Sequence, residues 1–275
     1  MAHWTLEDIP WERFDAAKVD ADLLAVVKTA ALVEANAADY VLYLRNVFQG
    51  DAAFVAAAEQ WGVEEEQHGA ALGRWAELAD PGFSFEAALA DFRAGYSLDL
   101  ETTTSVRGSR AGELIARQVV ETGTSSFYSA IRDATDEPVL KAVAGRIASD
   151  EFFHYQLFAK HFRRYQREAR LSVWARLKIA LGRMQEAEDE ELGYAFFAAN
   201  VLQQNRAADF KAANYGREYQ RRALQLYRKP HIDNAVRMVL RAADLKPNGW
   251  LYKLASKLLW RVIAARSASM AKAAA

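Results

Sequence analysis

The 275-residue chain contains no cysteine, only five prolines and no long uncharged apolar run. Without cysteine it has no disulfides, thiolate zinc sites, iron–sulfur clusters or thiol nucleophiles, so any metal must be held by histidine and carboxylate ligands. A membrane-spanning helix needs roughly 18 apolar residues in succession, and we therefore expect none. Residues 1–15 are acidic and lack the apolar core of a secretory signal, which predicts a cytoplasmic protein.

The formal net charge of −1 hides a strong asymmetry. Residues 1–137 carry 10 Lys and Arg against 24 Asp and Glu, whereas residues 138–275 carry 25 against 12, so the halves have net charges of −14 and +13. A basic half suits an acidic protein, an anionic membrane surface or nucleic acid. Because no nucleic-acid-binding motif is present, we expect no nucleic-acid partner.

Long windows rich in Ala, Leu, Glu and Arg, with glycines mostly between them, predict an all-α protein. Asp51 and Asp136 are predicted to cap two of the long helices. Two helix pairs separated by a longer connection fit a four-helix bundle. The predicted long helices span 20–49, 51–80, 107–134 and 136–167, with a lesser helix over 84–98.

Residues 169–275 predict additional helices packed on that four-helix core, which spans 20–168. A short helix covers 171–182, and a second helical segment over 188–228 is either continuous or broken near Gly216. Two terminal helices follow Pro230 and Pro247. Because no linker or repeat marks a boundary, we interpret residues 1–275 as one domain.

Two of the five histidines lie in Glu-x-x-His motifs near the middle of long predicted helices. Glu65 precedes His68 in the second long helix, and Glu151 precedes His154 in the fourth. Residues three apart share one helix face, so each motif presents a carboxylate and an imidazole to one point of the bundle interior.

Glu34 and Glu121 are mid-helix acids in apolar stretches of the other two long helices. Burying an unpaired carboxylate costs several kcal/mol. A single mid-helix Glu usually faces solvent, but the order and the nearly equal separations of 31 and 30 residues, from Glu34 to Glu65 and from Glu121 to Glu151, favour a joint site. One Glu from each of two helices and Glu-x-x-His from each of two others predict a two-iron site, with manganese as the alternative.

The motifs also resemble those of the soluble acyl-acyl-carrier-protein desaturases, a ferritin-like family, over roughly residues 20–165. The resemblance is carried by Trp61-x-x-Glu64-Glu65-x-x-His68-Gly69 and by Ile147-Ala148-Ser149-Asp150-Glu151-x-x-His154. It implies a homodimeric enzyme of fatty acid metabolism that takes electrons from a ferredoxin and desaturates acyl chains on acyl carrier protein. Phe152-Phe153 and Glu66-Gln67 depart from the charged residues usual in that family.

Further residues are predicted around the ligands. Glu121-Thr122-Gly123-Thr124 matches the family's Glu-x-x-Thr, which implies that the Thr124 hydroxyl assists oxygen activation; alternatively it bonds a carbonyl one turn earlier. A ligating histidine normally donates its free N–H to a carboxylate. We therefore predict that Asp150 and Glu64 each hold the histidine of the opposite motif. Trp61 either joins this network or packs in the core.

Carboxylate and imidazole ligands suit Fe(II) that is oxidised by O₂. Once reduced by two electrons, such a pair of ions reacts with O₂ to give an oxidant that abstracts hydrogen from an unactivated C–H bond. The ligands do not encode whether desaturation, hydroxylation, N-oxygenation or oxidative cleavage follows, and a ferritin-like iron-binding or peroxide-scavenging protein is the non-oxygenase alternative. Aromatic side chains either line an acyl tunnel or form the core: Tyr40, Tyr43, Phe48, Phe127, Tyr128 and Phe158.

Two basic surfaces are predicted in the C-terminal half. Residues 160–183 carry eight Lys and Arg against one acid, and Arg163, Arg164, Arg167 and Arg170 suit an acidic carrier or ferredoxin unless this is a plain solvated face. Residues 248–266 form a basic amphipathic helix that either packs on the bundle or makes peripheral contact with an anionic membrane. We favour packing.

Overall fold

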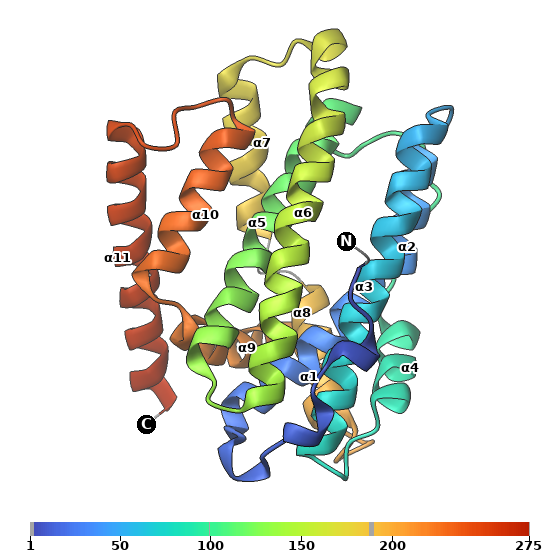
Figure 1. Cartoon of the computed structure of the whole chain (residues 1–275), viewed down its shortest axis with the longest axis vertical. Coiled ribbons are helices and arrows are strands. Elements are labelled where there is room, and N and C mark those ends of the chain that lie inside the picture. Colours follow the sequence, from blue (N-terminus) through green and yellow to red (C-terminus); the bar gives the residue numbers. More distant parts are fainter. Residues whose placement is uncertain (1–2, 99, 187–189, 275) are drawn as a thin grey trace.

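The computed structural model describes residues 3–98, 100–186 and 190–274, and no strand occurs within these ranges. The fold is an all-α helical bundle (Figure 1). Its central helices are α1 (Ala21–Ala35), α3 (Ala52–Ala79), α5 (Arg110–Ala134) and α6 (Pro138–Ala169). The remaining α-helices are α2 (Ala37–Val47), α4 (Phe85–Gly95), α7 (Val173–Glu186), α8 (Glu190–Phe197), α9 (Ala212–Leu226), α10 (Lys229–Ala242) and α11 (Trp250–Ala274).

The prediction of one continuous helix over 20–49 is wrong, because the chain is divided at Asn36 into α1 and α2. A helix end leaves carbonyl groups without intrahelical donors. Here Arg93 of α4 donates from Nη2 to the carbonyl of Ala35 at 2.8 Å, and from Nε to Oδ1 of Asn36 at 3.4 Å. The break is thus stabilised by a residue far away in the sequence.

The start of α6 also differs from the prediction, because Glu137 and not Asp136 is its N-cap. The fully buried Glu137 carboxylate accepts from the backbone N–H groups of Val139 and Leu140, at 3.2 and 2.7 Å. It also accepts from Nε1 of Trp75 at 2.7 Å, which joins α6 to α3. Asp136 is exposed.

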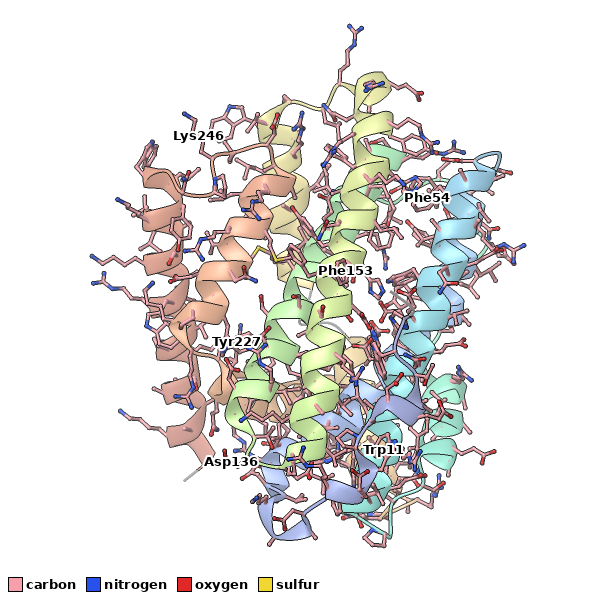
Figure 2. All side chains as sticks on the ribbon, viewed as in Figure 1. Trp11, Phe54, Asp136, Phe153, Tyr227 and Lys246 are labelled. Carbon is pink, nitrogen blue, oxygen red and sulfur yellow. The ribbon has the colours of Figure 1, made fainter. Side chains whose placement is uncertain are left out.

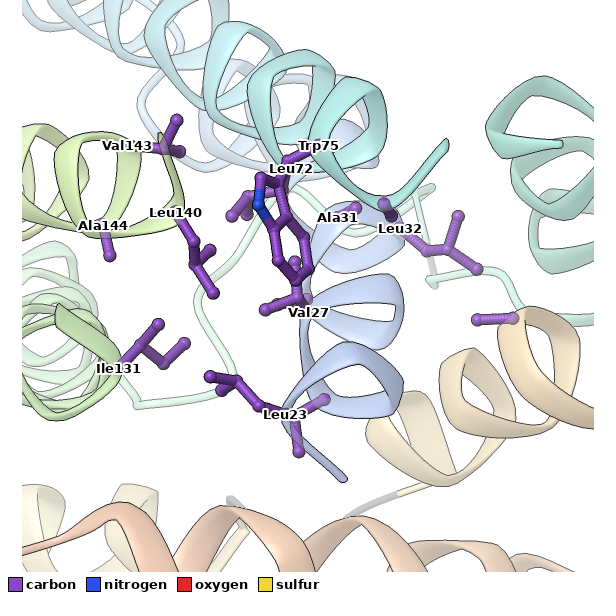
Figure 3. Packing of buried hydrophobic residues seen from close by; sticks show 14 of the residues in the cluster. Leu23, Val27, Ala31, Leu32, Leu72, Trp75, Ile131, Leu140, Val143 and Ala144 are labelled. Atoms are coloured by element: carbon purple, nitrogen blue, oxygen red, sulfur yellow. The ribbon is translucent and has the colours of Figure 1, made fainter. Parts of the chain in front are cut away.

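A continuous apolar core lies where the four central helices meet (Figure 3). Leu23 and Val27 of α1 pack there with Trp75 of α3, Ile131 of α5 and Leu140 of α6. Gly69 lets α1 and α3 approach closely, since a Cβ atom at this position would lie 2.6 Å from the backbone nitrogen of Ala35. This contact holds α1 against the helix turn that carries His68.

The C-terminal helices pack on the central bundle. Helix α8 contacts α1, α7 and α10 contact α5, and α11 contacts α9 and α10 at the outer edge (Figure 1). Both alternatives for the segment 188–228, a continuous helix and a break near Gly216, are wrong. Helix α8 passes into a π-helical turn (Ala198–Leu202) and ends before an irregular segment, 203–211, while Gly216 lies within α9. None of the described helices is long and apolar enough to cross a membrane.

Candidate metal centre

The six predicted ligands converge in the interior of the bundle, and all six are buried. Their candidate ligand atoms form two groups, and within each group the atoms lie within 4.8 Å of one another. Glu65 and Glu151 belong to both groups. Glu34 and His68 complete the first group, and Glu121 and His154 complete the second.

Both imidazoles direct Nδ1 toward the carboxylates. Nδ1 of His68 lies 3.4 Å from Oε1 of Glu151 and 3.7 Å from oxygens of both Glu34 and Glu65. Nδ1 of His154 is 3.1 Å from Oε1 of Glu65, and its other two carboxylate neighbours are 3.7 and 3.9 Å away: Glu121 and Glu151. The two rings are separated by 5.7 Å between centroids.

Several of these buried atoms lack a hydrogen-bond partner among the described residues: Nδ1 of both histidines and Oε1 of Glu121 and Glu151. Unsatisfied buried polar atoms are costly and call for an explanation such as an ion. Carboxylate oxygens and imidazole nitrogens are ligands that iron and manganese accept. The cluster therefore fits a pair of metal ions, whose identity the geometry leaves open.

The charges of the cluster depend on one another. Burial raises the pKa of Glu34 and Glu121 well above the ordinary range, and repulsion from Glu65 and Glu151 adds to the shift. Burial also disfavours ionised Glu65 and Glu151, but the two imidazoles beside them, together with the Glu34 carboxyl at Glu65, lower the pKa of both. Burial alone would lower the pKa of the two imidazoles. The carboxylates around them have the larger, opposite effect, so the pKa of both imidazoles is well above its ordinary value. Without cations, protons compensate the carboxylates.

Both predicted histidine partners make their hydrogen bonds. Nε2 of His68 lies 3.0 Å from Oδ2 of Asp150, and Nε2 of His154 lies 2.8 Å from Oε2 of Glu64. Each bond crosses from one Glu-x-x-His helix to the other. Burial alone would raise the pKa of Asp150 and Glu64. The hydrogen bonds from the histidines act in the opposite direction, and the pKa of both carboxyl groups is lowered. Because a carboxylate accepts from Nε2, each imidazole keeps Nδ1 directed at the cluster.

The N-terminal segment also reaches this network, which the sequence analysis missed. Nε1 of Trp4 donates to Oδ2 of Asp150 at 2.5 Å, and the Trp4 ring stacks on His68 with centroids 6.0 Å apart. Nε2 of His3 is 3.0 Å from the same oxygen. No sequence signal links residues so far apart, because no helical periodicity connects them.

Two hydroxyl groups contact the carboxylates. Thr124 is 2.6 Å from Oε2 of Glu151 and 3.3 Å from each of the carbonyls of Val120 and Glu121. Both predicted contacts of Thr124 are therefore present: one with the Glu151 carboxylate of the cluster and one with carbonyl groups of the preceding helical turn. Tyr128 donates to Oε1 of Glu34 at 2.5 Å, although the sequence suggested only a tunnel or core role for it.

Trp61 is not part of the hydrogen-bond network, because its buried Nε1 has no partner among the described residues. Its ring meets His154 edge-on at 6.5 Å between centroids and Phe158 at 5.7 Å. Of the two alternatives for Trp61, packing is the one that the structure supports.

A cavity of about 490 Å³ reaches the cluster, and Glu34, Glu65, Glu121 and Glu151 are all part of its wall. The rest of the wall is mostly apolar and is formed by side chains from α1, α2, α3, α5, α7, α8, α9, α10 and α11. Two of the six aromatic residues proposed for a tunnel line it: Tyr40 and Phe127. The other four belong to the packed core: Tyr43, Phe48, Tyr128 and Phe158.

The predicted basic surfaces are mostly accessible. Arg163, Arg164, Arg167 and Arg170 are exposed, and Arg164 forms an ion pair with Asp51. On the same helix Phe153, labelled in Figure 2, is 60% exposed. Helix α11 packs on α9 and α10 as favoured, through one of its faces only.

Comparison of the chain with models of known protein families and with curated proteins gives no match.

Proposed function

We propose that this protein is an O₂-dependent oxidoreductase with two iron ions, which desaturates the saturated acyl chain of a thioester on acyl carrier protein. The observation that carries the proposal is the apolar cavity whose wall includes four carboxylates of the cluster. Small-molecule sites are typically apolar cavities with a few polar groups placed at the reacting position. An iron-storing or peroxide-scavenging protein needs no such apolar space beside its metal site.

Six residues would hold the ions. Glu65 and Glu151 would be shared between both, while Glu34 with His68 and Glu121 with His154 would each serve one. When bound and reduced by the electron donor, the ions would activate O₂, which is the oxidant that an unactivated C–H bond requires. Manganese is the alternative occupant of the same ligand set.

The chain's own groups prepare the reaction. The apolar part of the cavity wall would hold the acyl chain beside the cluster, and Gly123 leaves its part of that wall without a side chain. The hydroxyl of Thr124 holds a proton at Oε2 of Glu151, where it is placed to be passed on during oxygen activation. Asp150 and Glu64 keep both imidazoles directed at the ions.

The partners are assigned on charge and on the resemblance. Exposed Arg163, Arg167 and Arg170 near the end of α6 suit the acidic surfaces of an acyl carrier protein or a ferredoxin-type electron donor. The resemblance also implies a homodimer, which a light-scattering mass of the purified protein tests.

Metal analysis tests the site itself. We expect about two iron or manganese ions per chain, with most of the metal lost in His154→Ala. The matched control is His161→Ala, which removes an imidazole from the same helix outside the cluster. Equal metal content in both variants contradicts the proposed site.

Activity is tested with reduced enzyme, ferredoxin and a panel of acyl carrier protein and coenzyme A thioesters. Consumption of O₂ with a new double bond supports the desaturase proposal. A hydroxylated or cleaved product keeps the metal site and assigns another oxygenase reaction. Peroxide-dependent iron oxidation without attack on any thioester assigns the non-oxygenase alternative.

A further inference from the structure

Helix α11 exposes a continuous row of apolar side chains. Trp250, Leu254, Leu258 and Val262 are 76%, 47%, 51% and 61% exposed. They follow one another at intervals of four residues, so they lie along one side of the helix. The opposite side, which includes Leu259 and Ile263, packs against α10. We call the four exposed residues the α11 apolar stripe.

The charge around this stripe has one sign. Residues 245–275 contain six Lys and Arg and no Asp or Glu. Lys253, Lys257 and Arg261 are exposed on the outward part of α11, next to the stripe. Lys246, labelled in Figure 2, adds a fourth exposed cation just before the helix begins. Single exposed apolar residues are ordinary, but an unbroken row flanked by cations indicates a binding surface.

We propose that the α11 apolar stripe and its flanking cations dock the protein on an anionic lipid surface. A basic amphipathic helix lies in the plane of a membrane, with its apolar side chains at the acyl boundary and its cations among the head groups. Each cation near such a surface contributes attraction that salt screens. The exposed Trp250 ring suits the interface, where tryptophan is enriched. This docking is independent of the metal site.

The absence of acids argues against a second copy on this surface. A twofold interface centred on α11 would place this helix against its own copy, and Lys253, Lys257 and Arg261 would then face cations with no carboxylate of α11 to pair with them. An acidic protein would meet the cations. The stripe is about 18 Å long, because a helix rises by that length over twelve residues. An anionic lipid surface can pair with the cations through its head groups and contact the whole stripe through its acyl chains.

Docking would also place the cavity beside the lipid. The packed face of α11 contributes Leu259, Ile263 and Arg266 to the cavity wall. One helix would therefore separate the bound lipid surface from the apolar cavity.

The test uses the full chain and vesicles of phosphatidylglycerol mixed with phosphatidylcholine, or of phosphatidylcholine alone. We expect the protein to sediment with the anionic vesicles, more weakly with the neutral ones, and less as salt is added. Replacing both Leu254 and Leu258 by Asn should weaken binding by roughly tenfold or more, because two leucine side chains lose their burial. Leu42→Asn, at a leucine 40% exposed on α2, is the matched control.

A second variant separates charge from apolar contact. Changing Lys253, Lys257 and Arg261 to Gln leaves the stripe intact and should abolish the preference for anionic vesicles. Circular dichroism confirms that each variant is folded. The proposal is overturned if the wild-type chain stays in the supernatant with anionic vesicles, or if the Leu254/Leu258 variant binds them as tightly as wild type. A wild-type dimer that the same variant makes monomeric assigns the stripe to a second copy.

Discussion

Oδ2 of Asp150 lies 3.0 Å from Nε2 of His68, although the two residues belong to different motifs on different helices. Trp4 donates to the same oxygen at 2.5 Å. Burial alone would raise the pKa of Asp150. The hydrogen bonds from His68 and Trp4 act in the opposite direction and lower this pKa, which favours the ionised carboxylate. The orientation of a predicted metal ligand therefore depends on one carboxylate.

Asp150→Asn should reduce metal affinity by roughly tenfold to a hundredfold, because removing the partner of a ligating histidine weakens its orientation and basicity. Competition with a chelator measures the change. The matched control is Asp133→Asn, because Asp133 holds His231 at 3.0 Å outside the cluster. A similar loss in both variants would show that the effect is not specific to the site.

The shared carboxylates should matter more for metal content than the unshared ones. Glu65→Ala or Glu151→Ala removes a ligand from both groups, so we expect the loss of both ions. Glu34→Ala or Glu121→Ala removes a ligand from one group only and should leave about one ion per chain. Elemental analysis of the four purified variants measures the difference. The same loss in all four variants contradicts the shared arrangement.

Gly123→Leu should separate the cavity from the metal site. A Cβ atom at Gly123 meets no heavy atom within 4 Å, and the residue lines the cavity. Folding should be unchanged or stabilised by up to about 1 kcal/mol, since glycine disfavours helix. Metal content should remain and oxidation of long acyl chains should be lost. Gly216→Leu, with equal free space in α9 away from the cavity, should keep full activity.

Glu137→Ala should lower the free energy of unfolding by about 3 kcal/mol, because it removes an N-cap and leaves the buried indole N–H of Trp75 without its acceptor. Urea unfolding measures the loss. Asp136→Ala, at the exposed neighbour, should change stability by less than about 0.5 kcal/mol. Equal effects would assign the capping role to Asp136 after all.

Loading the site with metal should release protons. The pKa of Glu34 and Glu121 is raised by burial, and that of both imidazoles is raised by the carboxylates around them, so the metal-free cluster binds protons more tightly than the same side chains do in water. Ligation requires these groups to be deprotonated. Affinity should therefore fall as pH decreases. Titrations in buffers of different ionisation enthalpy measure the protons, and a heat independent of buffer contradicts this prediction.

The convergence of the six acidic and histidine residues was predictable because helical periodicity places Glu65 with His68 and Glu151 with His154 on one helix face each, and the order and nearly equal separations of the acids favoured a joint site. The hydrogen bonds of Asp150 and Glu64 followed from the same reasoning. Other features depend on contacts between distant segments. The break at Asn36 relies on Arg93, and the contact of Trp4 with Asp150 spans 146 residues. Neither contact leaves a local pattern in the sequence.

The way the two ligand groups share carboxylates has a mechanical consequence. Each group draws ligands from both halves of the chain: Glu151 of the basic half joins the group of Glu34, Glu65 and His68, and Glu65 and Glu121 of the acidic half join the group of Glu151 and His154. Two bound ions would act as cross-links between the acidic half and the basic half. Since a ligand that binds only the folded chain stabilises it by mass action, the supply of metal would affect the stability of the whole bundle as well as its chemistry.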